Sequence, residues 1–196
     1  MPDSLPPTRP DVLEFLLTRR SRPAKMLRAP GPDREVLTQL LTAAARVPDH
    51  GKLEPWRFLV LERGALDRLA RLCAARGAAL GEAPEKIEKA AATFADSPFA
   101  VAVIASPKPS EKIPEIEQLL SAGAACLSLV NAALARGFGA CWLSGYAAHD
   151  RVFCEEGLGL APHERVAGFI HIGRAEAIPP ERPRPDVAAL TRWVES

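Results

Sequence analysis

The longest apolar stretch of the chain sets the strongest limit on its fold. Residues 113–136 have the length and spacing of a helix, and from Ala122 to Ala135 the segment is apolar on nearly every side. A helix without a polar face must be covered all round, so we expect this one at the centre of the molecule. Gly137 supplies its C-terminal stop. No stretch approaches the roughly eighteen uncharged apolar residues of a membrane span, so we expect the helix in a protein core.

Shorter elements are predicted on both sides of this helix. Further helices are expected at 11–20, from Pro32 to the break at Pro48, and at 65–80, 83–94 and 150–156. Strands are expected at 56–61, 98–105, 138–143 and 166–172. The charged, proline-containing segment 108–112 is expected to be a loop or a mobile flap. This irregular order predicts an α+β fold, in which helices wrap a mixed central sheet.

Length and charge restrict the class of protein. A chain of 196 residues suits one domain, or one protomer of a compact dimer. Lysine and arginine number 25 against 24 acidic residues, and this net charge of +1 gives no field for a nucleic-acid backbone or an anionic membrane. Residues 1–10 are expected to be flexible and lack the apolar region of a signal peptide, which favours a cytoplasmic protein. The single domain is expected over 11–196, with a proline-rich arm from about residue 178 packing on a partner subunit.

The familiar signatures of nucleotide, metal and hydrolase sites are missing. A G-x-G-x-x-G motif begins at Gly137 but has Trp142 where the third glycine belongs, and no Walker A, H-E-x-x-H or G-x-S-x-G motif occurs. The cysteines are too widely spaced for a structural zinc site or a disulfide scaffold, which leaves buried or surface thiols. They are Cys73, Cys126, Cys141 and Cys154. An enzyme of this sequence would therefore carry its chemistry on a bound organic cofactor.

Three short segments carry residues suited to a ligand. Arg19, Arg20 and Ser21 follow the first helix, and two guanidinium groups beside a hydroxyl suit a phosphate. The alternative is a solvated basic helix end, which the helix dipole also favours. The second segment, from Arg46 to Phe58, places His50 on a proline-bracketed loop before a buried strand. His50 could act as an acid, a base or a hydrogen-bond donor, or be an ordinary exposed histidine.

The third segment, 137–145, follows the long helix. Its glycines allow close approach to the backbone, and its strand delivers Ser144 and Gly145 at its end. Ligands of α/β-type sheets tend to lie beyond strand ends. A purely structural strand and turn would have the same sequence, so this segment alone does not decide between the two interpretations.

In order and spacing the three segments resemble the nitroreductase family, and most closely its minimal-length, YdjA-like branch. That branch carries Arg-Arg-Ser near the N-terminus, a Pro-Asp-His…Pro-Trp-x-Phe block, and Gly-Phe-Gly-x-x-Trp-x-Ser-Gly after a long helix. The matching residues are 19–21, 48–58 and 137–145. The resemblance extends from about the first helix to the last strand, and it implies an intertwined homodimer with FMN in two clefts at the dimer interface.

The resemblance also implies roles for individual residues. Arg19, Arg20 and Ser21 would hold the FMN phosphate and ribityl chain, while Arg46 and His50 would reach the same flavin from the partner subunit. The residues that would line the flavin are Trp142, Leu143 and Ser144. Basic residues near the C-terminus would face the phosphate, with Arg184 favoured over Arg182. A weaker carry-over assigns a nicotinamide-nucleotide stretch to Ala132, Ala133, Leu134, Ala135, Arg136 and Gly137.

The implied activity is an FMN-dependent NAD(P)H oxidoreductase. Hydride would pass from NAD(P)H through flavin N5 to a nitroaromatic, a quinone or a similar acceptor, without a side-chain nucleophile. His50 or Arg46 could stabilise the negative charge of reduced flavin. Alternatives are a different acceptor chemistry, a non-catalytic flavin-binding protein for storage or sensing, and a domain whose site has decayed. The preference between NADH and NADPH, and the physiological acceptor, stay open.

Two positions depart from the pattern of the branch. Leu143 stands where arginine is expected in the closest relatives, which removes one charge beside the flavin. Gly51 and Lys52 replace a lysine followed by a small polar residue, which shifts a positive charge along the loop. FMN binding is expected to survive both changes, whereas substrate preference and redox potential are expected to respond to them.

Overall fold

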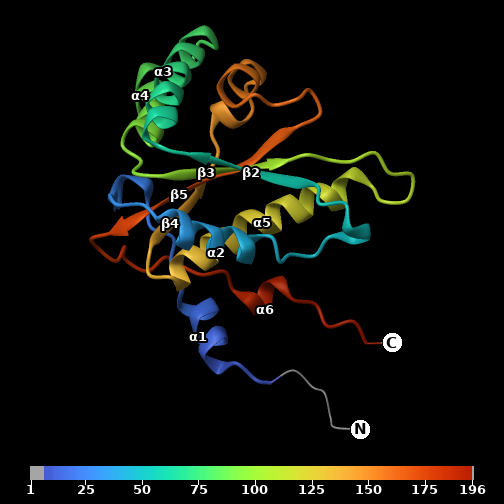
Figure 1. The fold of residues 1–196 in the computed structure, drawn as a ribbon. Helices are drawn as coiled ribbons and strands as arrows, with labels where there is room; N and C mark the ends of the chain where they lie inside the picture. The colour runs from blue at the N-terminus through green and yellow to red at the C-terminus, as the bar shows by residue number, and fades with distance from the viewer. Residues whose placement is uncertain (1–6, 196) are drawn as a thin grey trace.

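The computed structural model describes residues 7–195, and in it a central sheet lies between two layers of helices (Figure 1). The prediction of an α+β fold is confirmed. Of the N-terminal segment predicted to be flexible, residues 1–6 lie outside the described residues, and Pro10 already begins the first helix.

The described part of the chain contributes five strands to the sheet. They are β1 (Leu27–Arg28), β2 (Trp56–Leu61), β3 (Ala100–Ala105), β4 (Gly139–Leu143) and β5 (Arg165–Ala175). β5 has β3 on one edge and β4 on the other, because Phe169 lies opposite both Ala102 and Leu143. β2 lies beyond β3, and β1 pairs with the last residues of β5.

All of these strand pairs are antiparallel, so the expectation of a mixed sheet is wrong for the described strands. The connections explain why. The helices α3 (Arg63–Ala79) and α4 (Pro84–Ala95) form a hairpin that returns the chain to the end of the sheet it left, so β3 runs against β2. The single helix α5 (Glu115–Ala135) does make β4 parallel to β3, but β5 lies between these two strands and no parallel pair forms.

Each face of the sheet is covered by its own helices. α3 and α4 lie on one face, while α5 and α2 (Arg34–Ala44) lie on the other (Figure 1). The strand β3 is completely buried, and its side chains alternate between the hydrophobic cores on the two faces of the sheet. Ala102 and Ile104 pack toward α3 and α4, whereas Val101 and Val103 pack toward α2 and α5.

The predicted elements compare closely with those of the structure. The strand at 56–61 is confirmed at both ends, and the strands at 98–105, 138–143 and 166–172 are confirmed with shifted ends. The helix predicted at 150–156 contains a π-helical turn, Phe153–Gly157. β1 was not predicted, because two residues are too short to show a periodic pattern.

α5 differs from its prediction in one respect. Its inner side packs on the sheet, but Ile116, Leu120 and Leu127 are exposed in this single chain, so the helix is not covered all round. By length and composition it could also cross a membrane: an 18-residue window has a mean hydropathy of 1.5, and 44% of that window is buried here. The prediction that no stretch of the chain approaches a membrane span in length and composition is therefore wrong. α5 packs against β3, β4 and β5, and this packing explains why its composition is apolar.

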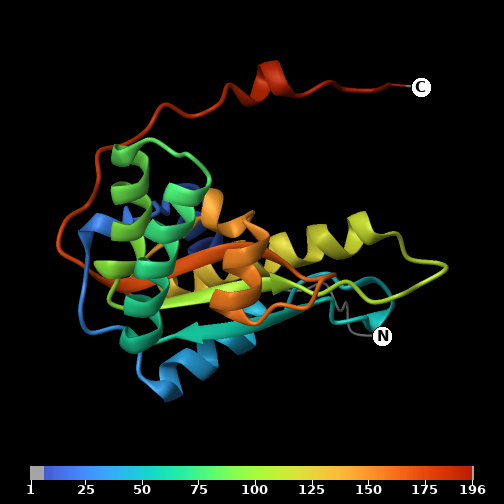
Figure 2. The same ribbon diagram turned by 90° about the horizontal axis from the view of Figure 1, so that it is seen from above.

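The two ends of the chain leave the body of the molecule. The C-terminal segment, including α6 (Val187–Leu190), runs apart from the sheet and its helices (Figure 2). Its large apolar side chains are exposed, among them Leu190 and Trp193, and so are Leu13 and Leu17 of α1 (Pro10–Thr18). Among the residues that the structure describes, both segments therefore leave large apolar side chains exposed.

Candidate functional site

A cleft of about 650 Å³ lies where α1 ends and α5 ends. Arg19 and Arg20 line one wall, and Leu134 and the residues from Gly137 to Gly139 line the facing wall. Gly137 makes this turn possible, because its φ of +88° is strained for other residues and lets the chain reverse from α5 into β4. The fold therefore brings the first and third sequence segments together.

Arg19 has a hydrogen-bond donor that no described residue of the chain satisfies. Its Nη2 donates to Ser21 Oγ at 3.0 Å, but its Nε is buried and has no hydrogen-bond partner among the described residues. Burial, followed by the nearby charges of Arg184 and Arg20, lowers the pKa of Arg19 below its ordinary value. A partly buried cation beside like charges is costly by itself, so this arrangement fits an anion that accepts from Arg19.

Arg20 and Arg184 are tied to the start of the C-terminal arm. The Arg20 side chain is only 11% exposed; its Nη1 donates to the Pro180 carbonyl at 2.6 Å and lies 3.2 Å from the Glu181 carboxylate. Arg184 pairs with the same carboxylate at 2.7 Å. Arg20 and Arg184 thus share one carboxylate, with the like charge of Arg19 close by. The surplus positive charge of the three arginines matches a phosphate dianion. Arg182 contributes only its backbone N–H, to Glu181, so Arg184 is the better placed of the two predicted arginines.

β4 leads away from this cleft along the open edge of the sheet. The Ala140 carbonyl accepts from the backbone N–H of Arg22 at 2.8 Å, so it points away from β5. In an antiparallel pair alternate residues face outward, and the register of β4 is unshifted, so Trp142 also presents its backbone N–H and C=O to the open edge. Ser144 and Gly145 continue along this line, with Ser144 exposed. This row of backbone groups can hold a planar ligand by its polar rim.

The indole of Trp142 is fixed across the sheet edge. Its Nε1 donates to the Ala167 carbonyl at 3.2 Å, where β5 extends beyond the end of β4. Gly168 makes room for the ring, since a Cβ there would lie 2.0 Å from Trp142 Nε1. Leu143, the next residue, points to the opposite face of the sheet, toward α4.

The second sequence segment forms a compact loop elsewhere. The Asp49 carboxylate accepts from the backbone N–H groups of Leu53 and Glu54, which holds the loop closed. Ser121 of α5 accepts from the Trp56 indole and donates to the Pro48 carbonyl. No separate role was predicted for Asp49 from the sequence, so this structural role was missed. Local spacing could have suggested it, since aspartate often bonds backbone groups a few residues ahead.

His50 is exposed and bonded to the start of α5. Its Nδ1 lies 2.7 Å from Glu117 Oε2. A carboxylate only accepts, so this contact places the proton on Nδ1 and leaves Nε2 directed elsewhere. Arg46 is exposed, with no side-chain hydrogen bond or ion pair among the described residues. Both side chains are therefore available to a ligand or a partner.

The loop that carries His50 and the end of α1 lie at opposite ends of α5 (Figure 1), and the cleft lined by Arg19 and Arg20 lies at the end where α1 ends. His50 contacts Glu117, whereas the cleft is lined by Leu134, and 17 residues of helix separate these positions by about 26 Å. The structure therefore brings Arg19, Arg20, Ser21 and Arg184 together with the beginning of β4. It does not bring His50 to them within one chain.

The stretch 132–137 is only partly exposed to the cleft. Leu134 and Gly137 line it, whereas Ala133 is buried in the core on the α5 side. Ala135 and Arg136 are exposed at the helix end, and Ala132 is partly buried against the same core. Its assignment to a nicotinamide nucleotide stays a prediction.

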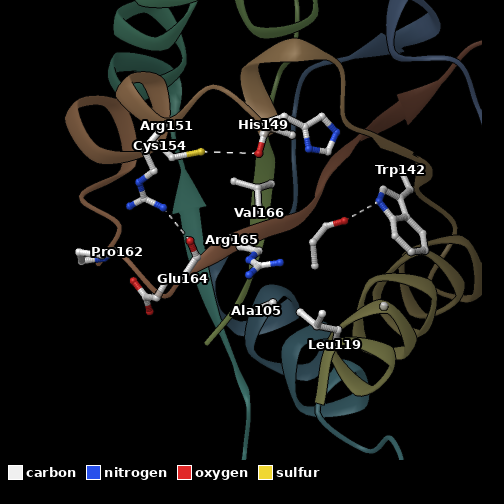
Figure 3. Close-up of a pocket in the computed structure, with 13 residues that line it drawn as sticks. Ala105, Leu119, Trp142, His149, Arg151, Cys154, Pro162, Glu164, Arg165 and Val166 are labelled. Atoms are coloured by element: carbon white, nitrogen blue, oxygen red, sulfur yellow. Dashed lines mark hydrogen bonds between the residues drawn. The ribbon is translucent and has the colours of Figure 1, made fainter. Parts of the chain in front are cut away.

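A second hollow of about 630 Å³ is bordered by Trp142, by Leu119 of α5 and by residues between Ala148 and Ala167 (Figure 3). This hollow was not predicted from the sequence. Two of its charged groups are already hydrogen-bonded. Arg151 donates to Glu155 and to three carbonyl groups, and the Glu164 carboxylate accepts from Nε and Nη2 of Arg57 at 2.6 and 2.7 Å. This pair lowers the pKa of Glu164 to about 2. These residues fasten the wall of the hollow rather than offering groups to a ligand.

All four cysteines are buried and unpaired thiols. Burial raises the pKa of each, to about 12 for Cys126 and Cys141. Thiols held in this protonated state are poor nucleophiles, so none of them is a candidate for covalent catalysis.

Comparison with known proteins agrees with this geometry. The model of the nitroreductase family matches residues 16–174, which contain both ends of α5 and the whole of β4. The chain belongs to the nitroreductase family. It is 34% identical to "Putative NAD(P)H nitroreductase YdjA" of Escherichia coli K12 over 163 residues, 83% of this chain and 87% of that protein. It is 38% identical to a Haemophilus influenzae protein named "Putative NAD(P)H nitroreductase", over 83% of this chain and 88% of that protein.

Solved structures of this nitroreductase family share the fold. A nitroreductase-like protein from Bacillus cereus superposes with a TM-score of 0.79 at 22% identity, over 98% of this chain and all of the other. A nitroreductase from Bacteroides fragilis, solved with bound FMN, gives a TM-score of 0.72 at 21% identity, over 94% and 99% of the two chains. The predicted nitroreductase-like fold is thereby confirmed.

Proposed function

We propose that this protein is an FMN-dependent NAD(P)H oxidoreductase, with a nitroaromatic, a quinone or a similar compound as its electron acceptor. The observation that carries the proposal is the Arg19 cluster, in which a buried guanidinium nitrogen lacks a partner beside Ser21, Arg20 and Arg184. A phosphate monoester supplies the acceptor oxygens and the negative charge that this cluster lacks. FMN carries such a group at the end of its ribityl chain.

The open edge of β4 supports one orientation of the cofactor. If Arg19 holds the phosphate, the outward backbone groups of Trp142 and the exposed Ser144 would be the residues available to hold the flavin ring. Bound FMN supplies reversible two-electron chemistry, accepting hydride from NAD(P)H and passing it to the acceptor. The protein binds and orients the ring and excludes water, and no side-chain nucleophile is required. Leu134 and Gly137 of the weaker nicotinamide assignment border the same cleft.

We propose further that the working form is a homodimer with FMN at the subunit interface. The separation of about 26 Å along α5 means that His50 and Arg19 can serve one flavin only when they come from different chains. The exposed apolar residues of α1, α5 and the C-terminal arm give this dimer its surface. Leu120 of α5 is 66% exposed, and Trp193 of the arm is 85% exposed. The arm, anchored at its start by Arg20, is free beyond that point to cross to the partner.

The decisive experiment is a visible spectrum of the purified protein, followed by anaerobic addition of NADH or NADPH. Flavin absorption bands that bleach on addition, and return when an acceptor such as a quinone is supplied, would support cofactor, donor and redox activity together. A protein that stays colourless after FMN titration and desalting would refute the proposal. The alternative, a non-catalytic flavin-binding protein, predicts bands that do not bleach, or that bleach without turnover when acceptor is added.

A further inference from the structure

Leu143 points from β4 into a hollow that carries two lysines. The hollow measures about 360 Å³ and is lined by Leu143, by Lys25 after the Arg-Arg-Ser segment, and by Lys89 of α4. A neighbouring hollow of about 280 Å³ also contains Lys89 and Leu143, and it continues to Ser144 and Gly145. Lys89 therefore stands where the two hollows meet, next to the end of β4.

The charges around this pair of hollows are mostly positive and partly free. Lys25 and Lys89 form no ion pair with any residue the structure describes. Lys86, one turn earlier on α4, is held 2.6 Å from Glu82, with its ammonium over the Tyr146 ring. Of the described residues, Asp96 is the one carboxylate that lines either hollow. Most of the remaining wall is apolar, supplied by Pro23, Ala24, Ala92 and Leu143.

An apolar slot with free ammonium groups suits a planar group that carries negative charge. Hydride transfer from NAD(P)H brings two electrons and one proton to FMN, so reduction leaves the cofactor one charge more negative. That charge resides on the pyrimidine side of the flavin ring, and a neighbouring cation stabilises it. Leu143 supplies none, although it occupies the position where the family resemblance predicts arginine.

We propose that Lys89, together with Lys25, borders the pyrimidine side of the flavin and stabilises the negative charge gained on reduction. The proposal rests on the proposed function, and it gives these lysines the electrostatic role that the sequence suggested for His50 or Arg46. It also accounts for a leucine at position 143, because the positive charge comes from α4 and from the segment after Ser21 instead of from β4. Lys89 touches the cofactor in this arrangement, whereas Lys86 is kept away from it by Glu82.

The test measures the FMN dissociation constant and the midpoint potential of the holoprotein for Lys89→Gln, Lys25→Gln and the control Lys86→Gln. All three remove one positive charge, and the two on α4 do so from exposed positions one turn apart, so the fold is expected to survive. We expect Lys89→Gln to weaken binding of reduced FMN about tenfold relative to oxidised FMN. That ratio corresponds to a potential about 30 mV lower for a two-electron couple. Lys25→Gln should give a shift of the same sign and smaller size, and Lys86→Gln should leave the ratio unchanged.

Three results would overturn the assignment. Unchanged potential and affinity in Lys89→Gln would remove the lysine from the flavin, and an equal shift in Lys86→Gln would reduce the effect to the general field of the helix. A Lys89→Gln variant with normal potential but lost preference for 4-nitrobenzoate over neutral 4-nitrobenzamide would show that the hollow receives the acceptor instead. Failure of the proposed function looks different, because the unaltered protein would then bind no FMN at all.

Discussion

In the sequence, the segments that reach the two ends of α5 both offer basic side chains to a ligand. In the folded chain these side chains lie in very different environments. At the C-terminal end, Arg19 is partly buried, crowded by like charges and short of a hydrogen-bond partner. At the N-terminal end, His50 is exposed and already bonded to Glu117. The first arrangement is costly unless an anion arrives, whereas the second is stable by itself. We infer that the C-terminal end provides most of the affinity for the cofactor, and that the N-terminal end completes the site of the other subunit.

Breaking the dimer should lower the FMN affinity most, because it separates the two ends of α5 that would share one cofactor. Leu120→Glu places a carboxylate on the exposed apolar face of α5, and two-fold symmetry doubles its cost, because each unpaired charge buried at an interface costs several kcal/mol. We expect a monomer by analytical ultracentrifugation and an FMN affinity lowered by about a hundredfold or more. The control is Leu80→Glu, an exposed leucine at the end of α3. A monomeric Leu120→Glu variant with unchanged FMN affinity would show that one chain binds the cofactor alone.

Removing the Arg19 side chain should have the next largest effect on FMN affinity. Hydrogen bonds to charged groups contribute about 1.5–3 kcal/mol each, so Arg19→Ala should weaken FMN binding by about 10- to 100-fold in a fluorescence titration. Without FMN, the same change removes a repelled, incompletely bonded cation, so the melting temperature of the apoprotein should stay constant or rise. Arg9→Ala, at the other end of α1 and paired with Asp11, is the matched control. An apoprotein strongly destabilised by Arg19→Ala would mean that this arginine has a structural role instead.

Lowering the pH should destabilise the central sheet, on which α5 packs, through a buried histidine. His171 is buried in β5, with its Nδ1 2.8 Å from Ser97 Oγ, and burial lowers its pKa to about 4. Between the unfolded value near 6.5 and pH 4, the unfolded chain takes up a proton that the folded chain refuses, so stability falls as the pH falls. The full loss is about 3 kcal/mol, of which about 2 kcal/mol should appear between pH 6.5 and 5 in urea unfolding of the apoprotein.

The control for this effect is the same titration on His171→Asn, whose stability should change less over that pH range. The variant retains a polar group near Ser97 but no group that titrates between pH 6.5 and 4. Equal slopes for both proteins would assign the acid sensitivity to other groups.

The sequence predicted the scaffold better than the site because the two depend on different kinds of information. Strand 56–61 and the long helix follow from local periodicity, which each segment carries in itself. The meeting of Arg19 with Gly137 depends on a chain reversal after α5, which a family pattern can indicate and periodicity cannot. The charges of Lys25 and Lys89 beside Leu143 were not foreseen, because α4 shows only ordinary surface lysines until it is folded against β4. The mixed sheet was wrongly expected because strand order, and not strand direction alone, decides which strands pair.

Mixing two defective subunits gives the smallest signal and the sharpest test of the comparison. In a two-fold dimer each flavin would meet Arg19 of one chain and the Arg46 and His50 side chains of the other. One protomer therefore carries Arg19→Ala, its partner carries Arg46→Ala with His50→Ala, and the two are unfolded and refolded together. A mixed dimer gathers all three substitutions in one site and leaves the other site intact.

Random pairing yields mixed dimers in about half of the population, so about one quarter of all sites should regain unaltered FMN affinity and NAD(P)H oxidation. Each variant refolded alone is the control and should regain none. A mixture that only averages its two components would place Arg19 and His50 on the same flavin from one chain, or on different ligands. The separation along α5 excludes the first arrangement, so that result would mean that His50 takes no part in flavin binding.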